Sequence, residues 1–111
     1  TFILRLDGLL ATNPDVDYMR MPYDFRLTAV RASVLVGGAS VTVDIQEEGV
    51  TILSTLLTID AWEETSTTAA TPVVISDYAL ADDAEVTIDL TTGEGEVPRD
   101  LKVYLIGYRT T

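Results

Sequence analysis

The chain has 111 residues, enough for one domain with its own core, and its 18 acidic and 7 basic side chains give a formal net charge of −11. It has no cysteine and no histidine, which excludes disulfides, thiolate nucleophiles, sulfur-ligated metals and the Ser–His and Cys–His catalytic pairs. The negative charge repels phosphate backbones and disfavours nucleic-acid partners, and no apolar run approaches the roughly 20 residues that span a bilayer.

Three extended segments are predicted in the N-terminal third. Alternation of apolar and polar residues in 1–12 predicts a strand, and turn chemistry at 13–15 predicts a loop after it. Residues 18–21 predict a short strand at a sheet edge, because the proline that follows has no N–H to give a ladder. Residues 25–36 predict a longer strand, and the parity of its apolar positions changes near Ala29. That change predicts either a bulge or a strand that passes from one sheet to another.

The middle of the chain alternates strongly. Two glycines at 37–38 predict a tight hairpin with positive backbone angles, followed by a strand over 41–45. The sequence Glu-Glu-Gly at 47–49 predicts a second hairpin turn with its glycine in the left-handed region. Residues 50–59 predict two short strands, and the threonine- and alanine-rich segment 60–76 predicts a loop. The residues expected to point inward in the two short strands are Ile52, Leu57 and Ile59.

The C-terminal third predicts two further strands. Residues 77–84 form a turn region with Leu80 as a plug beneath it, and strict alternation over 85–90 predicts a strand. Residues 91–100 predict a mobile loop, and 101–109 predict the last strand. Both faces of that strand are apolar toward its end, which predicts burial on both sides or contact with another chain. Its two faces carry Leu101, Val103 and Leu105 on one side and Tyr104, Ile106 and Tyr108 on the other.

The fold class follows from the number and spacing of these segments. About eight short strands separated by frequent turn signals, without an amphipathic helix, predict an all-β fold. The expected architecture is a single-domain, two-sheet antiparallel β-sandwich of jelly-roll form over residues 1–111. Because the first residue is not methionine, we expect the domain to be a processed chain or a module cut from a longer protein.

No group of residues predicts a catalytic or metal site. The acidic clusters at 82–85 and 94–100 lack the spacing of a calcium loop, and solvated turn carboxylates explain them better. A carboxylate pair for glycoside hydrolysis carries no signal in a chain with so many acids. The serines lack a histidine partner and a nucleophile-elbow motif. We therefore expect no catalytic residue, no metal, no cofactor and no enzymatic activity.

Two features suggest contact surfaces. The segment 18–25 contains two tyrosines, a phenylalanine, both methionines and an arginine, types that are enriched at protein interfaces. It is interpreted as core lining, as an oligomer interface or as a platform on which a sugar stacks. Trp62 is interpreted as a cap on one end of the core, or as a ligand contact for a sugar. The candidate oligomer interface consists of Tyr18, Met19, Arg20, Met21, Tyr104, Ile106 and Tyr108.

The residues VDIQEEGVTILST at 43–55 and LTIDA at 57–61 resemble a β-domain that recurs in structural proteins of tailed bacteriophages. There an aspartate and a hydrophobic residue precede a short turn with glycine, followed by an Ile-x-Ser/Thr strand. The segments 26–34, 80–89 and 101–107 are similar as well, so the resemblance covers nearly the whole chain. The sequence departs from the pattern at two turn tips: the acidic pair before Gly49, and the loop 91–98.

The resemblance implies a component of the virion surface: a head fibre, a capsid decoration protein or a tail-fibre module, often trimeric. It implies other virion proteins, such as the major capsid protein, as partners. The first functional hypothesis is thus a non-enzymatic structural protein that assembles as a symmetric oligomer. The alternative is a carbohydrate- or receptor-binding module of a tail fibre or secreted protein, with a host surface glycan as ligand and Trp62 as its contact.

Overall fold

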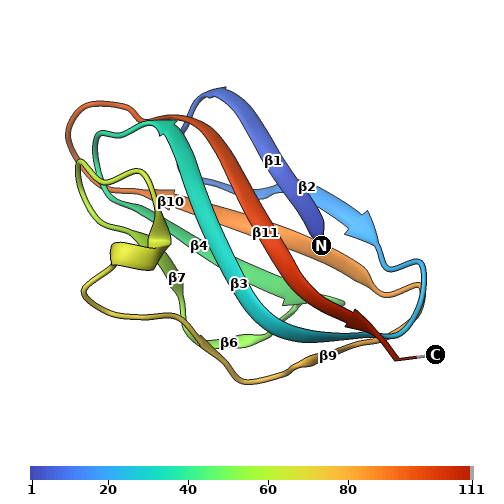
Figure 1. Cartoon of the computed structure of the whole chain (residues 1–111). Coiled ribbons are helices and arrows are strands. Elements are labelled where there is room, and N and C mark those ends of the chain that lie inside the picture. The colour runs from blue at the N-terminus through green and yellow to red at the C-terminus, as the bar shows by residue number, and fades with distance from the viewer. Residues whose placement is uncertain (111) are drawn as a thin grey trace.

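The computed structural model describes residues 1–110 and confirms an all-β sandwich, with two antiparallel sheets facing each other (Figure 1). The described residues form eleven strands and one short 3₁₀ helix. In chain order these are β1 (Phe2–Leu9), β2 (Asn13–Arg20), β3 (Phe25–Val36), β4 (Val41–Glu47), β5 (Val50–Thr51), β6 (Leu53–Thr55), β7 (Leu57–Ile59), η1 (Ser66–Thr68), β8 (Val74–Ile75), β9 (Ala79–Leu80), β10 (Glu85–Thr92) and β11 (Arg99–Arg109).

The strand order is that of a jelly roll. One sheet has the order β1-β11-β3-β9, and the other has β2-β10-β4, with β5 and β7 both paired to the free edge of β4. Leaving out the short strands β5, β6 and β8, the chain passes from one sheet to the other at each successive strand, except between β4 and β7, which lie in the same sheet. This path is the double Greek key of a jelly roll. The predicted number of about eight strands corresponds to this frame. The three additional strands are two or three residues long, and β6 and β8 pair with each other.

Alternation in the strands builds the core between the sheets. Successive side chains of a strand point to opposite faces, so every second residue over 41–45, 86–90 and 101–105 is apolar and buried. Leu80 is also buried, under the loop where the sequence predicts a plug, and the three inward residues of β5 to β7 are buried as predicted. The fully buried core residues of the three long strands are Val41, Val43, Ile45, Val86, Ile88, Leu90, Leu101, Val103 and Leu105.

The change of parity in β3 is a bulge. Ile106 of β11 lies opposite Ala29 and Gly107 lies opposite Leu27, so Thr28 is an extra residue without a partner across the ladder. The inserted residue allows apolar side chains on both sides of it to face the same core. Of the two explanations offered by the sequence, the bulge is the one observed, and the strand stays in one sheet.

The prediction of a loop at 13–15 is wrong. These residues are the first three of β2, and the connection from β1 lies at 10–12. Asp15 has a φ of 50°, and the register between β2 and β10 shifts beside it. The Asp15 N–H donates to Oδ1 of Asp89 on β10, which holds the irregular strand end against its neighbour. Turn-forming residues are therefore used inside an edge strand, where pairing on one side only tolerates irregularity.

The prediction of a tight hairpin at Gly37 and Gly38 is also wrong. The strands on either side, β3 and β4, belong to different sheets, and neither glycine has a positive φ. A Cβ at Gly38 would lie 2.3 Å from the carbonyl oxygen of Glu96, and one at Gly37 would lie 2.9 Å from that of Glu63. The glycines are thus required by the close approach of other backbone segments. The predicted turn before β5 is confirmed, with φ values of 50° at Glu48 and 81° at Gly49.

Candidate functional site on the outer face of one sheet

Charge is divided between the two sheets. The strands of the β1-β11-β3-β9 sheet carry six of the seven basic residues and only two acidic ones, a formal charge of +4; we call it the basic sheet. The strands of the β2-β10-β4-β5-β7 sheet carry six acidic residues and one basic residue, a formal charge of −5; we call it the acidic sheet. The remaining ten acidic residues lie outside these strands. A net charge of −11 thus conceals one sheet of positive sign.

Two adjacent cross-strand rows form the centre of the outer face of the basic sheet. Ile3, Tyr104 and Arg31 lie opposite one another across β1, β11 and β3. Arg5, Lys102 and Ser33 form the next outward row, while the row between them points into the core. Side chains directly opposite on an antiparallel pair have Cβ atoms about 5 Å apart, so aromatic and cationic groups alternate at close range here.

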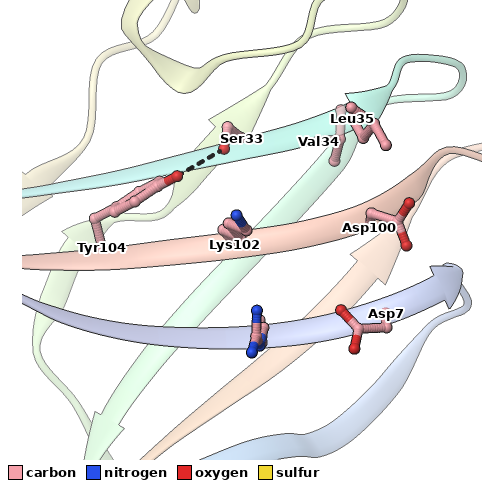
Figure 2. Close-up of a pocket in the computed structure, with 8 residues that line it drawn as sticks. Asp7, Ser33, Val34, Leu35, Asp100, Lys102 and Tyr104 are labelled. Carbon is pink, nitrogen blue, oxygen red and sulfur yellow. Dashed lines mark hydrogen bonds between the residues drawn. The ribbon is translucent and has the colours of Figure 1, made fainter.

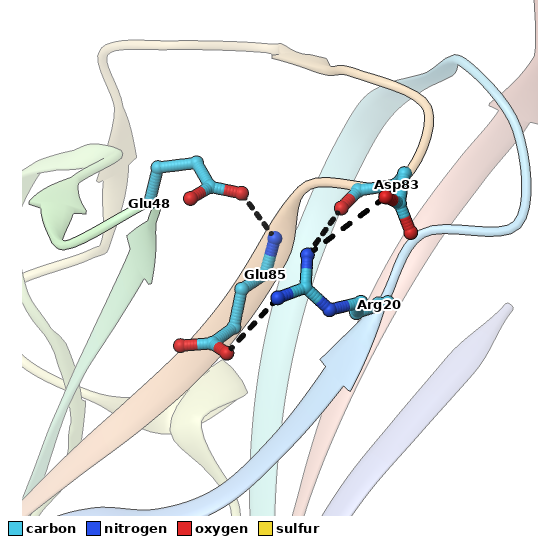
Figure 3. A network of polar contacts seen from close by, with 4 residues as sticks. All are labelled: Arg20, Glu48, Asp83 and Glu85. Atoms are coloured by element: carbon cyan, nitrogen blue, oxygen red, sulfur yellow. Dashed lines mark hydrogen bonds and ion pairs between the residues drawn. The ribbon is translucent and has the colours of Figure 1, made fainter.

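The cations of these two rows lack acidic partners. Among residues 1–110, the ion pairs within 4.0 Å all involve Arg20, at 3.7 Å from Glu85 and 4.0 Å from Asp83 (Figure 3). Arg5 and Lys102 are exposed and directly opposite each other, a like-charge arrangement that opposes strand pairing. In a chain with 18 carboxylates this placement leaves positive charge available to an external group.

The outer face is hollowed on both sides of Tyr104. The larger hollow, of about 470 Å³, lies beside Lys102, Asp100 and Ser33 (Figure 2). A smaller one, of about 370 Å³, is lined by Ile106 and by residues of η1 and the preceding loop. The Tyr104 hydroxyl and the Ser33 Oγ lie 3.4 Å apart, so this pair forms the ridge between the hollows (Figure 2). The face therefore has relief into which protruding side chains of a partner can fit.

The loop before η1 is fixed against β3 and bounds this face. Ser33 bridges to Thr65, and the Ala32 N–H donates to Oγ of Ser66 at 2.9 Å. The N–H of Thr67 donates in turn to Oγ1 of Thr65, which caps the short helix. The wall of the smaller hollow is thus held by the bridge to β3 and by hydrogen bonds from backbone N–H groups to serine and threonine hydroxyls.

The structure separates the predicted interface residues. Tyr104, Ile106 and Tyr108 point outward from β11 as predicted, and Tyr108 is 52% exposed. Tyr18 is 66% exposed, but it lies on β2 at the edge of the acidic sheet. One flat contact cannot include both groups, because they belong to opposite sheets of the sandwich.

Two members of the 18–21 segment have other roles. Met21 is 2% exposed and belongs to the core, so its inclusion in a surface is wrong for the single chain, and the core interpretation holds for it and for Phe25. Met19 is half-buried and packs against the core. Arg20 is exposed, and its guanidinium also donates to the Asp83 carbonyl oxygen (Figure 3).

Trp62 does not cap the core. Its side chain is 67% exposed, and its backbone adopts a φ of 68° in the turn that follows β7. The backbone N–H of Trp62 donates to the carbonyl oxygen of Gly38 at 2.7 Å, which fixes the turn and directs the ring outward. The prediction of a cap is therefore wrong, and the exposed ring remains a candidate ligand contact.

The cationic part of the face is absent from the residues selected by sequence. Arg5, Arg31 and Lys102 each occupy an outward position of an alternating strand, which the sequence pattern contains. Their proximity depends on β11 lying between β1 and β3, a pairing across about 100 residues of chain that no local signal encodes.

Comparisons with known proteins add no relative: no protein-family model matches, and searches of the curated proteins and of the solved structures found no match. Within residues 1–110 no helix is long and apolar enough to cross a membrane, and no three acidic side chains converge as metal ligands. The outer face of the basic sheet is the candidate site on the strength of its own charge and geometry.

Proposed function

We propose that the chain is a non-enzymatic structural module of a tailed-bacteriophage virion, displayed on the particle surface as a head fibre or capsid decoration protein. It assembles as a symmetric oligomer, a trimer, and contacts other virion proteins such as the major capsid protein. The observation that carries the proposal is the outer face of the basic sheet, where Arg5, Arg31 and Lys102 surround Tyr104 with no carboxylate of residues 1–110 within 4.0 Å of their charged groups.

Two further observations support it. The resemblance of residues 43–61 to a phage β-domain suggests the virion, and the jelly roll is an architecture used by viral capsid proteins. Lectin domains share that architecture, so the outer face of the basic sheet supports the proposed function more specifically than the fold does.

The composition of the face suits protein contact. Tyrosine and arginine dominate the strongest contacts at interfaces, and Tyr104 and Tyr108 project from the central strand of the three. Burial of about 400 Å² of apolar surface per subunit contributes on the order of 10 kcal/mol before the costs of ordering and lost freedom. Micromolar dissociation corresponds to a net gain of about 8 kcal/mol, so charge pairing must offset part of those costs.

The oligomeric state tests the proposal. We expect light scattering on a sizing column to give a defined multiple of 12.1 kDa. Tyr104→Asp and Tyr108→Asp should each dissociate the assembly and leave the far-ultraviolet circular dichroism spectrum unchanged. Val97→Asp is the control, because it places the same carboxylate at an exposed apolar position in the loop before β11. A monomeric wild type at micromolar concentration, or an assembly that survives both tyrosine variants, would contradict the proposal.

A second candidate function is a carbohydrate-binding module of a tail fibre or secreted protein. It is favoured by the exposure of Trp62 and by the hollow beside Tyr104, whose volume falls within the range of ligand pockets. Aromatic rings are suited to stacking on sugars. A glycan array with the wild type, Trp62→Ala and Tyr104→Ala would assign the contact, and absence of binding by the wild type would eliminate this function.

A further inference from the structure

The acidic sheet has a feature that mirrors the basic one. Asp44 of β4 lies directly opposite Asp89 of β10 on the outer face. Nε2 of Gln46 donates to Oδ2 of Asp89 at 2.8 Å and to Oδ2 of Asp44 at 3.3 Å, so one amide holds both carboxylates. Neither carboxylate has a cation within 4.0 Å among residues 1–110. Two like charges thus face each other across this ladder as well.

Both sheets therefore carry a like-charged pair on their outer faces, at positions where an opposite pair would stabilise the ladder. Arg5 and Lys102 form the positive pair, and Asp44 and Asp89 form the negative one. Asp89 also accepts from the Asp15 N–H and Asp44 from the Thr51 hydroxyl, and Asp7 and Asp100 line the hollow beside Arg5 and Lys102. Within residues 1–110, however, no opposite charge lies within 4.0 Å of either like-charged pair. An anionic ligand would neutralise only Arg5 and Lys102. A second copy of the chain supplies carboxylates for this positive pair and cations for the negative pair.

We propose that the outer face of the basic sheet in one copy docks on the outer face of the acidic sheet in the next copy. The inference rests on the proposed function, since it specifies how the chain assembles with itself. A contact of basic face on basic face would oppose Arg5 and Lys102 to their own equivalents. The contact is thus heterologous. Such a contact forms a closed ring where the rotation between successive copies closes, and an open filament where it does not.

This arrangement also accounts for the separation of the predicted interface residues. In a heterologous contact each subunit uses two different surfaces. Tyr104 lies on the basic face, and Tyr18 lies on β2 at the edge of the acidic one. The two tyrosines then belong to the two sides of one interface, contributed by neighbouring copies.

Mixing of charge-reversed variants tests the proposal. The basic-face variant is Arg5→Glu with Lys102→Glu, and the acidic-face variant is Asp44→Lys with Asp89→Lys. Each should be monomeric alone on a sizing column with light scattering, because one of its two faces has the wrong sign. Mixed in equal amounts they should associate, because the first retains a native acidic face and the second a native basic face.

Two controls separate this effect from net charge and from misfolding. Glu94→Lys with Glu96→Lys changes the net charge as much as the acidic-face variant does, but in the loop between β10 and β11, and should keep the wild-type mass. Asp44→Asn with Asp89→Asn removes both charges and keeps oxygens that accept from Gln46. This milder variant should fold as the wild type does, by circular dichroism, and dissociate at concentrations at least tenfold higher.

The outcomes distinguish the inference from the proposed function. If the wild type associates and the acidic-face variants associate equally well, docking of face on face is overturned while self-assembly stands. Failure of the mixture to associate, with both variants folded, overturns it as well. A monomeric wild type refutes both the docking and the self-assembly. If the monomeric wild type binds a sulfated polysaccharide and the basic-face variant does not, the basic face is assigned to an anionic ligand instead.

Discussion

Replacement of Gly107 by alanine should break the central pairing of the basic sheet. Gly107 lies in β11 opposite Leu27, beside the bulge of β3. A Cβ built on it would lie 2.0 Å from the carbonyl oxygen of Arg26 and 2.9 Å from Cε2 of Phe25. Carbon and carbonyl oxygen approach to about 3.3 Å at closest in sheets, so the two strands must separate by roughly 1 Å.

The size of the stability loss depends on which atoms must move to admit the added Cβ. Extra atoms in a packed interior typically cost 1–3 kcal/mol, and the upper end applies here because the obstacle is backbone held in a ladder rather than a flexible side chain. A loss of about 3 kcal/mol is a large part of the 5–15 kcal/mol that stabilises a domain. For a chain of this size it corresponds to a fall of roughly 13 °C in Tm.

The matched control is Gly49→Ala, and the assay is urea unfolding followed by far-ultraviolet circular dichroism. Gly49 has a φ of 81° and no heavy atom within 4 Å of the added Cβ, so the control measures backbone strain alone, about 1 kcal/mol. We expect the Gly107 variant to lose clearly more free energy of unfolding than the Gly49 variant. An equal or smaller loss would refute the steric reasoning.

Three further substitutions probe the core, the outer face and the exposed loop. Leu105→Ala, at a fully buried position of β11, should lower the free energy of unfolding by about 3 kcal/mol in the same assay. Lys102→Glu should raise the free energy of unfolding of the single chain by a few tenths of a kcal/mol, because it places an opposite charge across from Arg5. Sedimentation should show weaker assembly of this variant, and a loss of stability would contradict the expected repulsion between Arg5 and Lys102. Trp62→Ala should change stability by less than about 0.5 kcal/mol in thermal melts, since the ring is largely exposed.

The elements of the fold could be predicted because their signals are local. Alternation with a period of two identifies β4 and β10, and the change of parity in β3 identifies its bulge, since each depends only on neighbours in sequence. The positive φ at Gly49 follows from the length of its hairpin. The roles of Gly38 and Gly107 could not be predicted, because they depend on backbone that approaches from Glu96 and Arg26, in segments distant in the chain.

The sequence predicts which residues of the site point outward, but not which of them share a surface. Parity shows that Tyr104 and Tyr108 point away from the core, and both do. Parity cannot show which sheet a strand joins. It therefore allows Tyr18 and Tyr104 to share one surface, although the jelly-roll winding places them on opposite sheets. Trp62 was misplaced for a different reason: a left-handed turn decides where its ring points, and no neighbouring glycine or asparagine in the sequence indicates that turn.

The net charge of this chain determines its long-range electrostatics, whereas the signs of its two sheets determine its contacts. At separations beyond a Debye length, about 8 Å at physiological ionic strength, a copy of this chain is an anion. In contact, its partner meets either the basic sheet or the acidic one, and the two differ in sign. General repulsion keeps the chains apart in most orientations, while one orientation brings Arg5 and Lys102 against Asp44 and Asp89. In the docking proposed above, the charge distribution thus favours contact of the basic sheet with the acidic sheet over contact between like sheets.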